Sequence, residues 1–250
     1  FIEIKIDIAS INDYRHSASK GNDWYENPSL WIFRNLLGKR SETSPRMAMG
    51  NSAEFGCALD LFFDRSDADV VEHCTNHMVN QFDDEWFDET DKVGGIALNL
   101  SKAIKEEFPD IGKPHLFQRK RRHKLGTLEN PVTTMTDFEW EDLIIDTKAT
   151  LAVPSQPREG HVRQQALYSV LIGKPAVLVY ASHKKYKVFE LSDEIIRSNY
   201  ETMINSFESL EVFMANAANT KTAMQMIPLN TDGYKWSEED REYAKENWNN

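Results

Sequence analysis

The sequence predicts an α/β protein in which a small mixed central β-sheet is flanked by helices. Three observations favour this class. Apolar residues have mainly helical spacing up to about residue 110, and the middle of the chain holds three short segments with strand-like alternation or β-branched residues. A helix, two further strands and a long amphipathic helix follow. Helices on both sides of a short group of strands are typical of an α/β core.

Composition restricts the class of protein further. The chain has 250 residues, of which 40% are hydrophobic and 11% aromatic, and this excludes disordered and collagen-like chains. Its longest apolar runs are far shorter than the roughly 18 residues that a membrane-spanning helix needs, so we expect no membrane partner. The net charge of -11 argues against indiscriminate nucleic-acid binding, but it leaves room for a local basic groove.

The first half of the chain is expected to hold one strand and a series of helices. Apolar and charged residues alternate over 2–8, which is the period of a strand, and Ser10 is a candidate N-cap for a short helix to Tyr14. Pro28 opens a helix that Gly38 ends. Further helices are expected from Pro45 to Asp64, from Asp67 to about Met78 and from Gly95 to about Phe108.

The second half is expected to begin with a meander of strands over residues 116–124, 132–138 and 143–150. Pro154 and Pro157 precede a helix from about Glu159 to Gly173. The order is completed by strands over 176–181 and 186–191, a long helix over 192–217 and a short acidic helix over 237–248.

The most informative chemistry lies where the third strand of the meander ends in Asp146-Thr147-Lys148. Side chains alternate along a strand, so Asp146 and Lys148 are expected to project to the same face. A carboxylate can hold Mg²⁺ or Mn²⁺, and a lysine can orient a water nucleophile, so the combination suits phosphodiester hydrolysis. The tripeptide alone is a weak signal, because the same pair could be a surface ion pair.

A second carboxylate is expected beside this pair. Asp137 ends the preceding strand, and a hairpin with its turn near residues 139–142 would bring it next to Asp146. Two hard oxygen ligands would then share one metal site.

Four motifs follow one another along the chain. They are Gly50-Asn51-Ser52-Ala53-Glu54 on a helix, Asp137 on a strand, Asp146-Thr147-Lys148 on the next strand, and Gln164-Gln165-Ala166-Leu167-Tyr168 on a later helix. Together they resemble the PD-(D/E)XK nuclease superfamily, in particular its RecB-like and lambda-exonuclease-like, phage-type branch. The segment Asn27-Pro28-Ser29-Leu30-Trp31 also resembles the helical opening of that branch, so the likeness covers most of the chain.

The resemblance implies a restriction-endonuclease-like core and a role for each motif. Glu54, Asp137, Asp146 and the Thr147 carbonyl are implied to bind one or two Mg²⁺ or Mn²⁺ ions, and Lys148 to position the nucleophile. Gln164 and Tyr168 lie at i and i+4 on one helix face, with His161 one turn earlier, and all three are expected to contact the substrate. The alternative interpretations are a solvated glutamate at position 54, a buried tyrosine beside a surface glutamine, and a surface histidine.

Some residues depart from the superfamily pattern. Thr136 stands where its name has proline, Thr134 replaces a frequent glycine, and Asp146 is shorter than glutamate. Relatives in this branch that carry iron–sulfur clusters use four cysteines. This chain has only Cys57 and Cys74, so no iron–sulfur cluster is expected, and so few cysteines fit a reducing cytoplasm.

A basic run lies in the first strand of the meander, just before the two strands that carry Asp137 and Asp146, with Lys or Arg at positions 119–122 and 124. Such a run in an acidic protein suggests a phosphate track beside the site, with Arg119 and Arg121 as substrate-binding residues. The alternative is a charged edge strand that prevents aggregation.

We therefore expect a single nuclease domain over 1–250, with a helical part to about 110, a catalytic core over about 115–220, and a tail with a short helix over 221–250. The resemblance implies a Mg²⁺- or Mn²⁺-dependent DNA exonuclease in recombination, repair or phage DNA processing, located in the cytoplasm of a bacterium or phage-infected host. Linear duplex or single-stranded DNA ends are the expected partners, with a single-strand annealing protein and a homo-oligomer as further candidates. A structure-specific endonuclease and a nuclease-like DNA-binding subunit without turnover remain alternatives.

Overall fold

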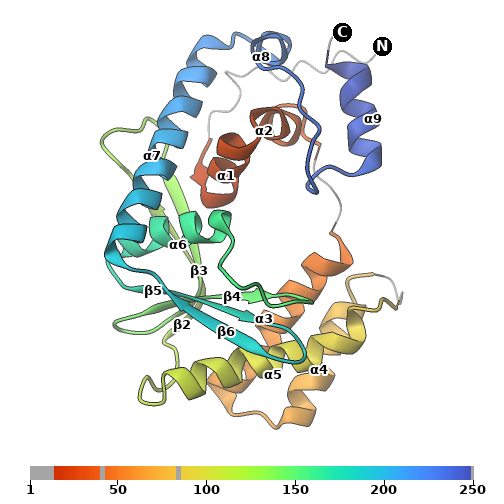
Figure 1. Cartoon of the computed structure of the whole chain (residues 1–250), viewed down its shortest axis with the longest axis vertical. Coiled ribbons are helices and arrows are strands. Elements are labelled where there is room, and N and C mark those ends of the chain that lie inside the picture. The colour runs from red at the N-terminus through yellow and green to blue at the C-terminus, as the bar shows by residue number, and fades with distance from the viewer. Residues whose placement is uncertain (1–13, 40–42, 83–85, 249–250) are drawn as a thin grey trace. The chain divides into compact units, whose positions relative to one another are not determined.

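The computed structural model describes residues 14–39, 43–82 and 86–248, and its central mixed sheet flanked by helices confirms the predicted α/β class (Figure 1). The strand predicted over 2–8 and the N-cap predicted at Ser10 lie outside the described residues. The described residues form two compact units. The first comes from within Phe1–Glu42, Arg121–Thr134 and Ser198–Asn250, and the second from within Thr43–Lys120 and Met135–Arg197. A single domain over the whole chain stays a prediction.

Three helices that pack on one another open the second unit (Figure 1). They are α3 (Pro45–Phe63), α4 (Asp67–Val79) and α5 (Thr90–Glu107). The start of α3 follows from its sequence, because Pro45 fits the first helical position and the Ser44 side chain accepts a hydrogen bond from the backbone N–H of Met47. Asp64 ends this helix in the left-handed region, at φ +50°. The helix α5 begins earlier than the predicted Gly95.

Six strands of the described residues form one mixed sheet in the order β1-β3-β4-β5-β6, with β2 paired to β3. They are β1 (His16–Ser17), β2 (Leu116–His123), β3 (Val132–Glu139), β4 (Ile144–Ala149), β5 (Ala176–Ala181) and β6 (Tyr186–Glu190). The strands β3 and β4 form the predicted antiparallel hairpin, and β4 runs parallel to β5. The parallel pair needs a long crossover, and helix α6 (Glu159–Ile172) provides it.

Alternation along β5 shows that helices cover both faces of the sheet. Val177 and Val179 belong to the large core formed with α3, α4 and α5. Leu178 and Tyr180 contact Val162 of α6 instead. Successive side chains of a strand point to opposite faces. The sheet therefore lies between the α3–α5 helices and α6.

The same alternation places the acidic residues of β3 and β4. Phe138 and Ile145 point into the core with α3–α5. Their neighbours Asp137 and Asp146 therefore face the α6 side. Asp137 lies two residues before the end of β3 and Asp146 is the third residue of β4, so the two strands deliver both carboxylates to one side of the sheet.

The first unit is built from helices around an aromatic core. They are α1 (Ala18–Glu26), α2 (Pro28–Asn35), α8 (Thr220–Met226), α9 (Glu238–Asn247) and most of α7 (Asp193–Asn216). The ring of Trp31 is fully buried and lies edge-on to Trp24 at 5.6 Å between ring centroids. A Cβ on Gly21 would come within 2.4 Å of the Met203 sulfur, so only glycine lets α1 approach α7 this closely. The helices α1 and α8 are absent from the sequence prediction, although Ser17 caps α1 as a standard N-cap residue.

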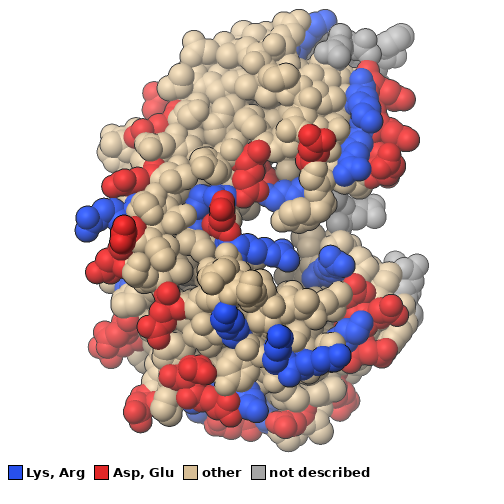
Figure 2. Space-filling view, in the orientation of Figure 1, with Lys and Arg blue, Asp and Glu red and all other residues tan. Residues whose placement is uncertain are grey.

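Charges of both signs are mixed over the face in Figure 2, so the net charge of -11 does not form one acidic patch there. Within the described part of the chain, no helix is both long and apolar enough to span a membrane.

Candidate active site

The predicted hairpin brings Asp137 to the middle of the candidate site. Phe138 pairs with Ile145, so the next pair along the ladder is Asp137 and Asp146. The Oδ2 atom of Asp137 accepts a hydrogen bond of 2.8 Å from the backbone N–H of Thr147 and one of 3.3 Å from its hydroxyl. The position of the Asp137 carboxylate is therefore fixed by the strand that carries the other motif.

Asp146 is held from two sides. Its Oδ2 atom forms an ion pair with the ammonium of Lys148, two residues further along β4, as the same-face prediction requires. Its Oδ1 atom accepts a hydrogen bond of 2.9 Å from Nε2 of Gln164 on α6. The carboxylate is 1% exposed. Charged and polar partners on both oxygens offset the loss of water that burial of a carboxylate entails.

Glu54 belongs to the same unit and interacts electrostatically with Asp146 and Lys148. Its Oε1 atom accepts a hydrogen bond of 3.1 Å from Nε2 of Gln118 on β2. Gln118 has φ +48°, a left-handed conformation that a residue with a side chain adopts at a cost. Strained backbone of this kind is frequent where a side chain must reach a functional site. The conformation of Gln118 is therefore linked to the position of Glu54.

Replacing Gln118 tests this link. Gln118→Gly and Gln118→Ala both remove the amide that contacts Glu54, but only glycine relieves the backbone strain. We expect the free energy of unfolding of the glycine variant to be about 1 kcal/mol higher than that of the alanine variant. Any DNA cleavage is expected to fall equally in the two variants, by about tenfold. Thermal unfolding and cleavage rates measure the two effects separately. Equal stability of the two variants would contradict the left-handed backbone at this position.

Burial and like charges disfavour the ionised carboxylates. Burial raises the pKa of Asp137 well above its usual range, and the charges of Asp146 and Glu54 raise it further. Burial also raises the pKa of Glu54, with a further contribution from Asp146. Burial alone would lower the pKa of Lys148, but Asp146 and Asp137 outweigh it, so its ammonium is retained. One cation, Lys148, thus offsets a group of carboxylates that would otherwise repel each other.

The donor set fits a hard divalent cation. Carboxylate oxygens are the ligands that Mg²⁺ and Mn²⁺ prefer, and Mg²⁺ commonly takes only one or two of them together with water and phosphate oxygens. No group of three His, Cys, Asp or Glu side chains in the described ranges stands ready to hold an ion. An ion here would therefore bind two of the three carboxylates together with non-protein or backbone oxygens, and the Thr147 carbonyl stays a predicted ligand.

The other predicted residues fall into different surroundings. Tyr168 is 6% exposed, its pKa is raised by burial to about 12, and it lies within electrostatic range of Asp137 and Asp146. His161 is half-buried and contacts Tyr180, with 2.6 Å between Nδ1 and the phenol oxygen. Arg119 is exposed on β2 in the second unit, whereas Arg121 belongs to the first. Their role in binding substrate stays a prediction.

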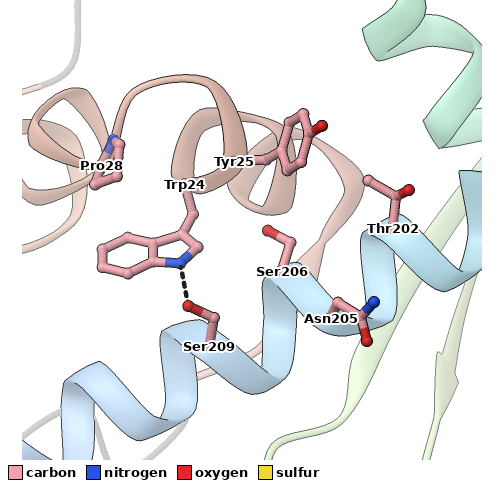
Figure 3. Close-up of a pocket in the computed structure, with 7 residues that line it drawn as sticks. All are labelled: Trp24, Tyr25, Pro28, Thr202, Asn205, Ser206 and Ser209. Carbon is pink, nitrogen blue, oxygen red and sulfur yellow. Dashed lines mark hydrogen bonds between the residues drawn. The ribbon is translucent and has the colours of Figure 1, made fainter.

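A pocket of about 450 Å³ lies elsewhere, in the first unit (Figure 3). Trp24 and Tyr25 of α1 line it opposite hydroxyl and amide side chains of α7, and Trp24 Nε1 donates to the hydroxyl of Ser209 at 3.4 Å. The described residues that line it include no carboxylate, lysine, arginine or histidine and none of the predicted site residues. It lacks the groups that hydrolysis of a phosphodiester requires.

Two residues at the site were missed by sequence reasoning. Gln118 carries no signal, because a positive φ is not visible in the sequence. Tyr180 is opposite Lys148 in the register of β4 and β5. Its position follows from strand alternation only once the pairing of these two strands is known.

Comparison with known proteins shows the fold. No family model matches the chain, and no curated protein matches it. A crystal structure from Eubacterium rectale, of a protein named "Putative exonuclease", aligns with 93% of this chain and 89% of its own, at 12% identity and a TM-score of 0.60. The chain thus shares the overall fold of that protein. A second structure, named SSO0001, aligns at 14% identity over 75% of this chain and 84% of its own, with a TM-score of only 0.31, and supports no argument.

Proposed function

We propose that this protein is a metal-dependent deoxyribonuclease of the PD-(D/E)XK type. The observation that carries the proposal is the convergence of Asp137, Asp146, Lys148 and Gln164 on one side of the sheet. Asp146 pairs with Lys148 and accepts a hydrogen bond of 2.9 Å from Gln164, and Asp137 accepts one of 2.8 Å from the backbone N–H of Thr147. The name of the Eubacterium rectale neighbour, a putative exonuclease, supports a nuclease activity, and DNA is our proposed substrate.

The chain's own residues perform three tasks in this proposal. Asp137 and Asp146 would hold the cation together with the Thr147 carbonyl, and Glu54 would assist through a bound water. Lys148 orients the attacking water and stabilises the negative charge that develops on the phosphate. Gln164 keeps Asp146 in place through its 2.9 Å hydrogen bond.

Mg²⁺ or Mn²⁺, as one or two ions, would supply a bound water of lowered pKa and would neutralise phosphate charge. Such a cation would also relieve the repulsion that burial and like charges impose on Asp137 and Glu54. The cation would then be a second positive charge, besides the Lys148 ammonium, that favours the ionised form of these carboxylates.

Within this class we propose an exonuclease that acts on DNA ends in the cytoplasm, in recombination, repair or phage DNA processing. A single-strand annealing protein and further copies of the chain are the proposed partners. A structure-specific endonuclease is the second candidate, because the same residues would serve it. The two activities differ in their substrates, because an exonuclease needs a DNA end and an endonuclease can cut a closed circle.

The deciding experiment incubates end-labelled linear DNA, closed circular duplex and circular single-stranded DNA with Mg²⁺, with Mn²⁺ and with EDTA, with Asp146→Ala alongside. Metal-dependent loss of linear DNA alone, absent in the variant, is the expected result. Cleavage of either circle would favour the endonuclease. Binding without cleavage under every condition would replace the proposal with a non-catalytic DNA-binding subunit.

A further inference from the structure

The three carboxylates of the candidate site share one pattern of hydrogen bonding, in which neutral donors hold one oxygen of each. The pairs are Asp137 Oδ2 with the N–H and hydroxyl of Thr147 at 2.8 and 3.3 Å, Asp146 Oδ1 with Nε2 of Gln164 at 2.9 Å, and Glu54 Oε1 with Nε2 of Gln118 at 3.1 Å. The donors come from β4, α6 and β2. Three separate elements therefore restrain the three carboxylates in the same way.

The second oxygen of each carboxylate is in different surroundings. Oδ1 of Asp137 and Oε2 of Glu54 accept no hydrogen bond from the residues that the structure describes. Oδ2 of Asp146 is paired with the ammonium of Lys148. A carboxylate oxygen has two lone-pair sites, so this atom can serve a cation and the lysine together. Each carboxylate thus has one oxygen held by a neutral donor and one oxygen that can turn to a metal ion.

This arrangement affects divalent cations differently. Ca²⁺ takes about six to eight oxygen ligands and often binds both oxygens of one carboxylate. Mg²⁺ requires nearly ideal octahedral geometry and keeps several waters, so one oxygen from each carboxylate is sufficient. A cation that binds both oxygens of Asp146 or Glu54 would have to displace an amide N–H, and the loss of that hydrogen bond has a cost.

We propose that Gln164 and Gln118, together with Thr147, are positioning residues that restrict each carboxylate to one metal-binding oxygen and so favour Mg²⁺ or Mn²⁺ over Ca²⁺. The inference rests on the metal site of the proposed function, since it assigns a divalent cation to these carboxylates. Two glutamines suit this role because an amide N–H holds a carboxylate oxygen without adding a charge that would compete with the ion.

The selectivity is tested without DNA cleavage. Gln164→Met and Gln118→Met each keep an unbranched side chain of similar length and remove the N–H donor. Free Mn²⁺ gives an electron paramagnetic resonance signal that weakens on binding, and displacement of bound Mn²⁺ by Mg²⁺ or Ca²⁺ gives the affinity for each ion. In both variants we expect Mg²⁺ to bind about tenfold more weakly. Ca²⁺ is expected to bind as tightly as before or more tightly, because the released oxygen becomes a further ligand.

The matched control is Gln165→Met. Gln165 follows Gln164 on α6 and is 1% exposed, and no hydrogen bond of the described residues joins it to the three carboxylates. We expect its ratio of Mg²⁺ to Ca²⁺ affinity to equal that of the parent. A ratio within twofold of the parent in both Gln164→Met and Gln118→Met would overturn the proposal, because equal losses for the two ions indicate only a damaged site. If thermal unfolding shows that one variant is not folded, the other decides.

The number of oxygens that the carboxylates supply is measured separately, by Ca²⁺-induced infrared difference spectra. Binding through both oxygens narrows the separation between the antisymmetric and symmetric stretching bands of a carboxylate. We expect this narrowing in Gln164→Met and Gln118→Met and not in the parent or in Gln165→Met. The same narrowing in the parent would overturn the restriction to one oxygen.

These results distinguish the inference from the proposed function. A protein whose ion selectivity shifts as expected, but which cleaves no DNA, would refute the nuclease proposal and leave the inference in place. A protein that cleaves DNA with Mg²⁺ and keeps the parent selectivity in both variants would overturn the inference alone. A parent protein that binds none of the three ions would refute both.

Discussion

Lys148→Ala is expected to lower DNA cleavage by about 10²–10³-fold while the protein remains folded. Lys148 is the cation paired with Asp146 at the candidate site, and removal of one preorganised charge-stabilising group from an active site has a cost of this size. Single-turnover cleavage of linear DNA at saturating protein measures the chemical step apart from binding.

The control for this variant is Lys113→Ala. Lys113 also pairs with a carboxylate in the second unit, that of Asp64, but both side chains are exposed. We expect cleavage within about twofold of the parent, since exposed ion pairs contribute little. Cleavage by Lys148→Ala at the parent rate, with an unchanged circular dichroism spectrum, would refute a role for this lysine and with it the proposed mechanism.

Asp137→Asn is expected to abolish cleavage and, in the absence of metal ions, to stabilise the fold. The amide oxygen can still accept the hydrogen bond from the Thr147 N–H, so the local structure is preserved. The variant loses a carboxylate whose ionised form is disfavoured by burial and by two neighbouring acids. We expect the free energy of unfolding to rise by about 1 kcal/mol, as is common when a destabilising functional residue is replaced, and the melting temperature to rise by about 2–4 °C.

The pH dependence gives the sign of this effect. The pKa of Asp137 is raised in the folded state above its ordinary value of 3.8, so the parent loses stability from this group as pH rises above that value. The advantage of Asp137→Asn is therefore expected at pH 7 and should shrink as pH falls towards 4. Thermal unfolding in EDTA across this range measures it, with exposed Asp110→Asn as the control. A variant less stable than the parent at pH 7 would show that the carboxylate is not under electrostatic strain.

The elements that carry the candidate site were largely predictable because their signals are local. Alternation and turn residues located β3 and β4, and the same-face rule placed Lys148 beside Asp146, as their ion pair confirms. The exact span of β5 also followed from its apolar run. Each of these inferences depends on residues that are close in sequence.

What depends on distant residues could not be predicted. The strand β1 is two residues long and is defined only by its pairing with Val132 and Thr133. The division into two units joins the start of the chain with residues beyond 198, and no linker composition signals it. The contact between Gln118 and Glu54 likewise requires a backbone conformation that composition does not reveal.

The three contacts along α6 imply that, among proteins that share this site, the number of residues between the contacting positions varies less than the amino-acid sequence does. His161, Gln164 and Tyr168 all face the sheet or its ends, at positions i, i+3 and i+7. Insertion of one residue between them would rotate the later part of the helix by about 100° and would separate Gln164 from Asp146. The loop over 150–158 and the turn after Gly173 are free of this restriction. Distant relatives should therefore be sought by a fixed interval between these three positions, with loops of any length on either side.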